Sequence, residues 1–396
     1  MPWKVSDAME VRARFVEDWR GGCWSLAELC RFYEVTRKTG YKWLERYEQG
    51  GIAALSDQSR APRHHPNSVS EELEERIIGM RGQHPRWGAR KIRALLEREG
   101  VGELAAVSTI GAILKRNGLT VARRRKARAQ PNAAALPVAG GPNDCWSADF
   151  KGWFRTLDGV RCDPLTLSDV YSRFLLRCQA VRAADTLHAK PVMEAAFREY
   201  GLPRRMRTDN GPPFSSNGES GLTALSVWWI RLGIMPERIQ PAHPEQNGRH
   251  ERMHRTLKQE TASPPGPNRR RQQERFDIFR LEYNEQRPHQ ALGQTPPAEH
   301  YEPSPRAYPE RLAAIEYPSE WQVRRVSNGG QIRWHSERVF IAHALEWEQV
   351  GLQQIGDHYW KIQFSFYEIG VLDTRRLKIL SPQRFQKRCE RENGGK

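Results

Sequence analysis

The sequence predicts a multidomain protein, with all-α units first, an α/β domain in the middle and a small β-domain last. Three observations lead to this prediction. The chain has 396 residues, which is enough for roughly two to four domains. Its first third places apolar residues at helical spacing, and strand-like and helical segments then alternate from about residue 144. Short alternating runs separated by turn residues close the chain, a pattern typical of a small β-barrel.

The charge of the chain indicates a polyanionic partner. The formal net charge is +16 and the pI is near 9.8, with 38% hydrophobic residues, so the chain can still build ordinary cores. Residues 1–142 hold 25 Lys and Arg against 16 Asp and Glu. Nucleic acid is the commonest partner of so basic a protein. A basic protein without such a partner is the alternative.

Membrane and disulfide classes are not favoured. No run of about 18 apolar residues occurs, and the first residues lack the apolar stretch of a secretory signal, so we expect no membrane partner. The six cysteines form no CxxC pair, which argues against a zinc ribbon or a disulfide framework. We therefore expect reduced thiols and a cytoplasmic protein.

Two short helices with a tight turn are predicted within residues 1–60. Ser25 and Glu28 form a capping-box pattern at the start of the first helix, and Thr36 can cap the second. The turn carries Glu34, where a glycine is more usual.

The second of these helices has two distinct faces. Tyr41 and Leu44 belong to its expected apolar face, together with Tyr47. Basic residues occupy the other side near its beginning: Arg37, Lys38 and Lys42. This arrangement predicts a helix-turn-helix whose second helix contacts DNA. The alternative is a small helical bundle with a solvated charged face.

A second helical domain is expected over residues 61–122. Apolar residues at helical spacing indicate three helices, and either a second helix-turn-helix or a plain linking bundle fits the pattern. Residues 123–143 begin with RRRKAR and continue as a Pro/Ala/Gly-rich tract. They predict a basic, flexible linker with affinity for phosphates.

Residues 144–305 read as an α/β domain. Three successive strands are expected in CWSADFKGWF, DPLTLSDVYS and RFLLRCQAV, followed by helices that alternate with strands around RRMRT and ERIQ. Residues 306–396 form the expected β-barrel. Its first hairpin should pair WQVRRV with QIRW across Asn328-Gly329-Gly330.

Three carboxylates stand out by their positions. Asp149 lies within a predicted strand, Asp209 at the end of another, and Glu251 in the first turns of a predicted helix. A carboxylate in an apolar strand is costly unless it is paired or binds a metal. Three such groups from separate elements can hold Mg²⁺ or Mn²⁺, and two ions about 4 Å apart can clamp the oxygens of a phosphoryl transfer.

The helix that carries Glu251 suggests which neighbours act with it. Arg255 and Lys258 follow at positions i+4 and i+7, so both share its face and are expected to meet DNA. Asn247 precedes the helix in a loop whose amides can approach a phosphate. Glu260 should point away from that face. The alternative for Glu251 is a solvated ion pair with Arg255.

Two other groups of residues near this helix are assigned no catalytic role. Glu245 lies before the helix begins. Three histidines lie here: His243, His250 and His254. No arrangement of HxxxH with an acidic residue recurs elsewhere in the chain, so we interpret them as polar contacts rather than a zinc site.

These motifs carry a family resemblance. SADF, RTDNGPPF, HPEQNGRHERMHRTLK and YNEQRPHQALGQTPPAEHY resemble the integrase-core DDE transposases of bacterial insertion sequences, most nearly the group numbered 481, a relative of group 3. The resemblance implies a ribonuclease-H-like catalytic core, like that of retroviral integrases. It places the metal-binding and catalytic acidic triad on Asp149, Asp209 and Glu251, and contacts to DNA ends on Asn247 and Lys258.

The resemblance also implies an activity and partners. Such an enzyme binds the terminal inverted repeats of its element, cuts the ends and joins the 3′-OH to target DNA with two Mg²⁺ or Mn²⁺ ions. It would act as a homo-oligomer, at least a dimer on double-stranded DNA, at the bacterial nucleoid. Two departures stand out. Asp209 and Glu251 are 42 positions apart (251 minus 209), longer than in many members, and the HHCC zinc module of retroviral integrases is absent.

Two alternative functions remain from the sequence. One is a ribonuclease-H-like nuclease that does not join strands. The other is a DNA-binding repressor with an inactive core, although the intact acidic triad argues against it.

Overall fold

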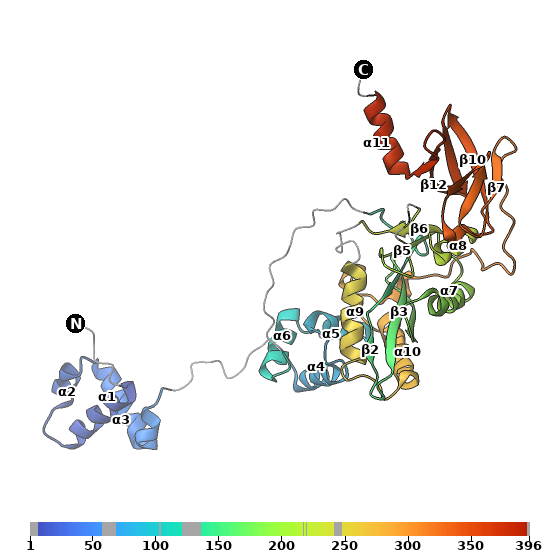
Figure 1. Cartoon of the computed structure of the whole chain (residues 1–396). Helices are drawn as coiled ribbons and strands as arrows, with labels where there is room; N and C mark the ends of the chain where they lie inside the picture. Colours follow the sequence, from blue (N-terminus) through green and yellow to red (C-terminus); the bar gives the residue numbers. More distant parts are fainter. Residues whose placement is uncertain are drawn as a thin grey trace. The chain divides into compact units, whose positions relative to one another are not determined.

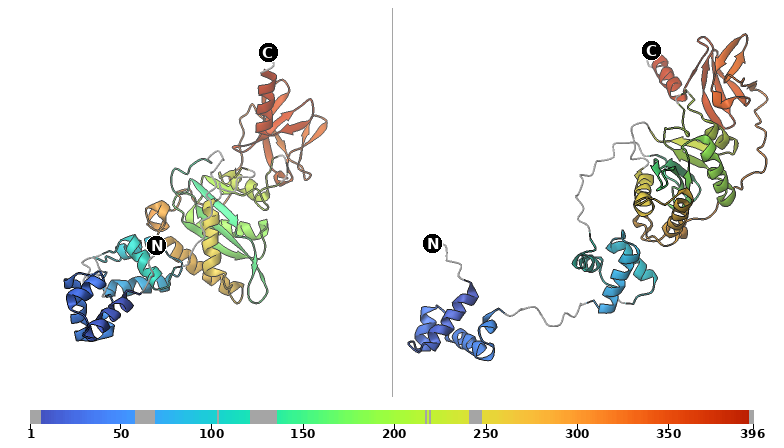
Figure 2. Two further views of the ribbon diagram at one scale, coloured as in Figure 1. Left: turned by 90° about the vertical axis from the view of Figure 1, so that its left-hand side faces the viewer. Right: turned by 60° about the horizontal axis from the view of Figure 1, so that its bottom comes forward.

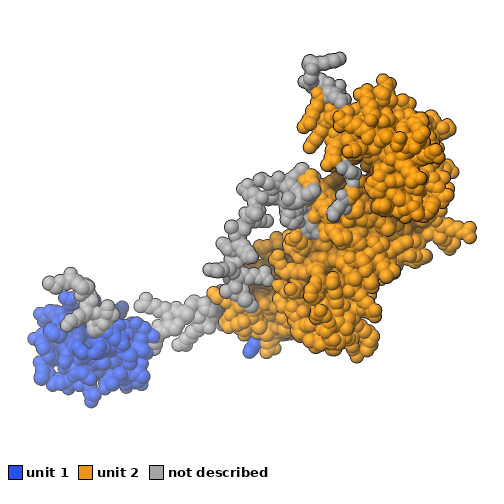
Figure 3. Space-filling model, viewed as in Figure 1, with its two compact units in different colours: residues 1–71 blue, residues 72–396 orange. Residues whose placement is uncertain are grey.

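The computed structural model describes residues 7–57, 69–102, 104–120, 136–216, 218, 220–240 and 248–393. Its contacts divide the chain into two compact units, Met1–Glu71 and Glu72–Lys396 (Figure 3). The finer domain boundaries expected from the sequence stay predictions. None of the helices in these described ranges is long and apolar enough to cross a lipid bilayer.

The first unit contains the two predicted helices and one that precedes them. They are α1 (Ala8–Arg20), α2 (Leu26–Phe32) and α3 (Arg37–Gly50), followed by the short η1 (Ile52–Leu55). The Glu28 carboxylate accepts hydrogen bonds from the backbone N–H and the hydroxyl of Ser25, at 3.0 and 2.6 Å. The hydroxyl of Thr36 accepts one from the N–H of Thr39 at 3.2 Å. Both predicted caps are therefore confirmed.

A close approach of α3 to its neighbours defines this unit. Gly40 is buried, and a Cβ atom there would lie 2.6 Å from the Cys30 sulfur. Glu34 in the preceding turn has a φ of 53°, the left-handed conformation that usually favours glycine. The expected apolar face was wrong for Tyr41, which is 64% exposed. The buried positions of α3 are Gly40 and Leu44, one helical turn apart, so Tyr41 faces solvent.

A six-stranded sheet forms the centre of the second unit. Its strands are β1 (Cys145–Phe150), β2 (Phe154–Arg155), β3 (Arg161–Asp169), β4 (Leu175–Val181), β5 (Arg205–Thr208) and β6 (Met235–Arg238). The three strands expected first are confirmed: β3 pairs antiparallel with both β1 and β4. On the other side of β1, β5 and β6 run parallel to it. The sheet is therefore mixed, and β1 is a central strand.

Four helices cover the two faces of this sheet (Figures 1 and 2). They are α7 (Thr186–Tyr200), α8 (Ala224–Arg231), α9 (Gly248–Thr261) and α10 (Arg269–Glu285), with short turns η3 (Gln290–Leu292) and η4 (Pro297–His300) after them. Trp146 and Ala148 of β1 pack in one core with α7 and α8. Alternate strand residues face opposite sides, so Ser147 and Asp149 point toward α9.

The second helical segment contacts this core. Its helices are α4 (Glu71–Gln83), α5 (Ala89–Arg98) and α6 (Val107–Arg116), as expected. His84, just after α4, contacts Glu282 of α10 through its Nδ1 at 3.0 Å. Arg98 at the end of α5 pairs with Glu299 at 3.2 Å. The basic run of the predicted linker lies outside the described residues.

The helix α8 is buried on two sides. Leu225, Trp228 and Trp229 belong to the core of the α/β sheet. Val227 and Ile230 of the same helix belong to the core of the C-terminal strands. The helix therefore separates two layers and contributes to both.

The C-terminal strands form open sheets. They are β7 (Gln322–Arg325), β8 (Gln331–Trp334), β9 (Glu337–Phe340), β10 (Gln349–Gly356), β11 (Tyr359–Phe364), β12 (Tyr367–Asp373) and β13 (Lys378–Leu380), with η5 (His343–Leu345) and α11 (Pro382–Asn393). One sheet has the order β13-β12-β11-β10-β7, and β8 pairs with β9 in another. Closure into the predicted barrel is thus not confirmed among the described strands.

The predicted first hairpin was wrong. The turn forms, because the N–H of Gly330 donates to the carbonyl of Ser327 at 3.0 Å, but β7 pairs with β10 and β8 pairs with β9. The N–H of Val326 donates to the carbonyl of Glu348 at 2.9 Å. This long-range bond holds the end of β7 beside β10, so the turn leads the chain from one sheet into the other.

Candidate active site

Two of the three predicted carboxylates lie near the ends of two neighbouring strands of the core sheet. In the parallel pair of β1 and β5, Ser147 lies beside Arg207. The pairing of the two strands ends there, and Asp149 and Asp209, the first residue after β5, each lie two residues farther along the chain. Because side chains alternate along a strand, Asp149 lies on the same face of the sheet as Ser147, the face that α9 covers.

The third carboxylate faces the first across a pocket. Asp149 and Glu251 both line an opening of about 610 Å³ between β1 and α9, and Arg255 and Lys258 line it too. This grouping agrees with the helix face expected from the sequence. Asp209 is not among the residues that line this opening, and its carboxylate accepts a hydrogen bond from the N–H of Gly211 at 3.1 Å.

The other acidic residues near this helix have different surroundings. Glu260 pairs with Arg287 on the side of α10, with both carboxylate oxygens 3.0 Å from one guanidinium nitrogen. Glu251 and Arg255 form no ion pair with each other in the described part of the chain, so the solvated-pair alternative is not favoured. The predicted DNA contact Asn247, together with Glu245 and His243, lies outside the described residues.

Two buried histidines connect α9 to the sheet beneath it. The Nε2 atoms of His250 and His254 lie 2.6 and 2.7 Å from the hydroxyl oxygen of Thr166 on β3. The Nδ1 of His250 lies 3.1 Å from the Ser147 hydroxyl, and the Nδ1 of His254 lies 3.8 Å from Asp149 Oδ2. The interpretation of these histidines as polar contacts is confirmed.

Burial keeps both imidazoles neutral. Burial lowers the pKa of His250 to about 3, and burial with the nearby His250 and Lys151 lowers the pKa of His254 well below its usual range. A neutral imidazole has one N–H and one lone pair. The single hydroxyl proton of Thr166 can serve only one acceptor, so at least one Nε2–H must donate to Thr166. The proton on the other nitrogen of each ring is set by these bonds.

The donor atoms at this edge fit a hard divalent cation. Asp149, Asp209 and Glu251 offer carboxylate oxygens, the ligands that Mg²⁺ and Mn²⁺ prefer. Asp149, His250 and His254 also offer ligand atoms within 4.8 Å of one another. However, three of the four imidazole nitrogens in that group already contact Thr166 or Ser147. The carboxylates are therefore preferred for the type of their donor atoms, while among the described residues the three of them are not gathered within 4.8 Å of one another.

The predicted recognition residues lie together on α3. Arg37, Lys38 and Lys42 are all exposed, and Tyr41 is exposed among them. An aromatic ring beside three cations suits contact with a sugar–phosphate backbone or a base edge. Tyr41 was assigned to the apolar face from the sequence, so its place in this patch was missed.

Sequence reasoning also missed the polar layer beneath α9. Thr166 pairs in register with Asp149, and Ser168 with Ser147. The signal was present as polar residues at alternate positions of two strands whose intervening residues are apolar. Such a pattern usually marks a solvated face, whereas here it marks residues that bond to a covering helix.

Comparison with known proteins gives matches over most of the chain. Families described as an integrase core domain match residues 139–244 and 232–297, a helix-turn-helix domain matches 11–63, and a homeodomain-like domain matches 39–114. The insertion element IS407 uncharacterized 31.7 kDa protein of Burkholderia multivorans is 30% identical over 238 residues, which are 59% of this chain and 82% of that protein.

Two further comparisons extend the same pattern. The insertion element IS476 uncharacterized 39.2 kDa protein of Xanthomonas euvesicatoria is 28% identical over 239 residues, 59% of this chain and 66% of that protein. A chain of the simian T-cell lymphotropic virus intasome, solved with the PP2A regulatory subunit B56 gamma, is 16% identical with a TM-score of 0.37, covering 74% of this chain and 97% of that one.

Proposed function

Because the chain belongs to the integrase-core transposases of insertion sequences, a family of polynucleotidyl transferases, we propose that its acidic edge cuts the ends of a mobile element and joins them to target DNA. The observation that supports this most directly is the pocket that both Asp149 and Glu251 line, with Asp209 following the strand that pairs with β1. Integrase cores generally depend on a divalent metal, which agrees with this set of carboxylates.

We assign the metal ligands to Asp149, Asp209 and Glu251. Two bound Mg²⁺ or Mn²⁺ ions would stabilise the charge on the attacking and leaving oxygens of phosphoryl transfer. The protein supplies three carboxylates from three elements, so their separation depends on how α9 is held against the sheet. His250 and His254 hold it there through Thr166, and His254 also faces Asp149.

The cations of the same pocket would bind the DNA strand. Arg255 and Lys258 are exposed and lie on the wall that carries Glu251. Their charges can contact the phosphates that flank the reacting one, which positions the strand without reading its sequence. Asn247, just before α9 in the chain, is proposed to contact the same DNA end.

Recognition of the terminal inverted repeats is assigned to the first unit. Arg37, Lys38 and Lys42 lie in the first two turns of α3, the helix that follows the tight turn. The N-terminal part of the second helix is the part that enters the major groove in this motif. Joining requires two element ends in one complex, so we propose a homo-oligomer, at least a dimer on DNA.

A strand-transfer assay tests this function. Labelled duplexes carrying the terminal repeats, taken from the DNA that flanks the gene, are incubated with the full chain and Mg²⁺. The wild type should yield joined products. Glu251→Gln, Asp149→Asn and Asp209→Asn should each lower cutting and joining by several orders of magnitude while the chain still binds the ends.

The matched control is Glu260→Gln, which removes the same charge two residues after Lys258 but breaks a pair with Arg287. It should keep activity within about tenfold, roughly 1.4 kcal/mol in the barrier. Nicked products alone would instead indicate a nuclease, and shifted complexes alone a repressor. Full activity in Glu251→Gln with loss in Glu260→Gln would contradict the assignment of the triad.

A further inference from the structure

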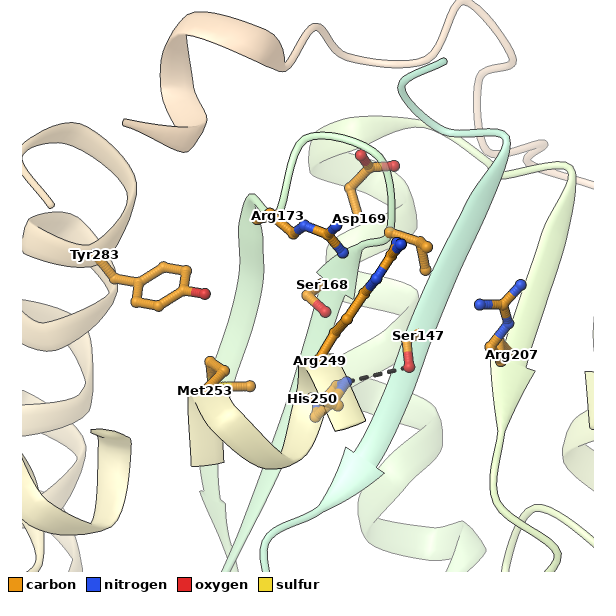
Figure 4. Close-up of a pocket in the computed structure, with 10 residues that line it drawn as sticks. Ser147, Ser168, Asp169, Arg173, Arg207, Arg249, His250, Met253 and Tyr283 are labelled. Atoms are coloured by element: carbon orange, nitrogen blue, oxygen red, sulfur yellow. Dashed lines mark hydrogen bonds between the residues drawn. The ribbon is translucent and has the colours of Figure 1, made fainter. Parts of the chain in front are cut away.

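A second cavity lies beside the acidic edge and is lined by arginines. It encloses about 40 Å³ and receives Arg173 from the turn after β3, Arg207 from β5 and Arg249 from α9 (Figure 4). Ser147 also lines it, and Ser147 is two residues before Asp149 on β1. The cavity is therefore about 7 Å along the strand from the carboxylates.

Two of these three arginines lack a counter-ion in the described part of the chain. Arg207 is held by Glu237, whose carboxylate accepts its Nε–H, and by the carbonyl of Pro137 at 3.0 Å. Arg173 and Arg249 form neither an ion pair nor a side-chain hydrogen bond among the described residues. Within the described ranges, neither charge is thus neutralised by an ion pair.

The nearest carboxylate on the cavity wall is already occupied. Asp169 is buried, and its oxygens accept hydrogen bonds from the N–H of Asn143 at 2.8 Å and from the N–H and hydroxyl of Ser172, both at 2.7 Å. No ion pair joins Asp169 to Arg173 among the described residues, and the charge of Asp169 acts on the Arg173 guanidinium only as the last of the causes that shift its pKa. Asp169 thus orders the turn that carries Arg173 through its bonds to Ser172.

The half-buried Arg173 and the exposed Arg249 both line this cavity, and their like charges repel each other. Burial, followed by the charge of Arg249, lowers the pKa of Arg173 to about 10. Such an arrangement is unfavourable until an anion lies between the charges. A guanidinium fork matches the paired oxygens of a phosphate, which is why arginine is frequent at phosphate sites.

The size of the cavity limits what can enter. A single water molecule needs roughly 10–15 Å³ of cavity volume. The volume of about 40 Å³ therefore accommodates the oxygens of one phosphate group and is too small for a nucleic-acid base. Arg249 is exposed, whereas Arg207 and His250 are buried, so a ligand would enter past Arg249. The small volume and the exposed entrance at Arg249 favour an anionic group whose larger molecule remains outside the cavity.

We propose that this cavity binds one backbone phosphate of the DNA strand, one not cut by the enzyme, through Arg173 and Arg249. The proposal rests on the proposed function, because the strand that reaches the acidic edge must pass beside the cavity. Its role would be to fix the strand so that the reacting phosphate lies at the carboxylates. The same chemistry would accept free inorganic phosphate.

The first experiment tests for an anion site without any DNA. The melting temperature of the full chain is measured in sodium phosphate and in sodium chloride at equal ionic strength and pH. Phosphate should raise the transition of the second unit by about 2 °C or more in the wild type, because a ligand that binds only the folded state stabilises it. Arg173→Gln and Arg249→Gln should lose this rise.

The matched control is Arg270→Gln, which removes one arginine from an exposed position on α10. It should keep the phosphate-dependent rise. Because Arg249 is exposed, Arg249→Gln remains informative even where Arg173→Gln fails to fold. Equal behaviour of Arg173→Gln, Arg249→Gln and Arg270→Gln would overturn the site.

The second experiment tests whether the anion belongs to DNA. Terminal-repeat duplexes carry a single neutral methylphosphonate at successive linkages around the cut. At one linkage, the neutral substitution should weaken DNA binding by the wild type about tenfold. The same substitution should leave DNA binding by Arg249→Gln unchanged, because this variant already lacks the arginine that contacts that phosphate. Arg249→Gln should also reduce the salt slope of binding by about 1, as expected for one lost phosphate contact.

The outcomes separate the possible sources of the anion. A phosphate-dependent rise in melting temperature without coupling to any linkage would overturn the assignment to DNA and leave a site for free phosphate. Neither readout requires cutting. A failure of this proposal therefore leaves the strand-transfer assay intact, and inactive protein still reports on the cavity.

Discussion

Replacing Thr166 with valine tests how the helix that carries Glu251 is held. The side chain of Thr166 is fully buried, and its hydroxyl contacts the Nε2 atoms of both His250 and His254. Valine has nearly the same shape, so packing is kept while two buried ring nitrogens lose their partner. An unsatisfied buried polar group costs about 1–3 kcal/mol, so Thr166→Val should destabilise this unit by roughly 2–6 kcal/mol. That is a large share of the 5–15 kcal/mol typical of a folded protein.

The comparison variant is Thr166→Ser, which keeps the hydroxyl and removes one methyl group. Its cost should be about 1 kcal/mol, the value for one buried carbon. Urea unfolding of both variants, followed by far-ultraviolet circular dichroism, measures the difference. A Thr166→Val protein within about 0.5 kcal/mol of Thr166→Ser would refute the reasoning, since the imidazoles would then not depend on the hydroxyl. In the strand-transfer assay Thr166→Val should be the weaker enzyme, because α9 carries a metal ligand.

Three other predictions follow from single residues. Burial, with nearby Lys91 and other cations, lowers the pKa of His289 to about 3 from 6.5, so the unfolded state binds a proton below about pH 6.5 and the folded state does not. His289 alone should lower the free energy of unfolding by about 2 kcal/mol from pH 7 to pH 5, in addition to the contributions of His250 and His254, and His289→Gln should remove its share in urea titrations. Gly40→Ala should destabilise the first unit by about 1–2 kcal/mol, because the added Cβ atom would lie 2.6 Å from the Cys30 sulfur. Gly79→Ala in α4 is the control: no atom lies within 4 Å of the added Cβ, so this change should stabilise the helix by about 0.5–1 kcal/mol. Arg37→Ala should weaken binding to the terminal repeat by about 1–3 kcal/mol and relax its specificity, and a uniform loss on repeat and scrambled duplexes would contradict base reading by α3.

Local patterns were sufficient for most helices and strands and for the proposal of an acidic site. The strands of the core follow the alternation of apolar residues, and the caps at Ser25 and Thr36 are decided within four residues. Asp149 could be singled out because a carboxylate inside an apolar strand is costly to bury unless it is paired or binds a metal. In each case the deciding contacts lie close in the sequence or follow from burial alone.

Contacts between distant segments decided the remainder. The Asn328-Gly329-Gly330 turn formed as its residues favour, yet the pairing of β7 with β10 depends on a segment more than 20 residues away, at Glu348. The bond between Thr166 and His254 spans 88 residues, and no local period reveals it. Tyr41 is on the solvent side because Gly40 faces Cys30, and neither propensity nor hydrophobicity indicates which neighbour a helix will meet.

The double burial of α8 has an evolutionary consequence. Six consecutive residues of this helix, from Leu225 to Ile230, are buried, and they divide between the two cores on either side. Arg231 adds a bond to Glu348 in the C-terminal segment at 2.8 Å. A gene fusion or deletion that replaced the C-terminal strands would expose Val227 and Ile230 to solvent, regardless of the function of the new domain. The C-terminal segment therefore cannot be replaced as an independent module. Its sequence should covary with that of α8 during evolution.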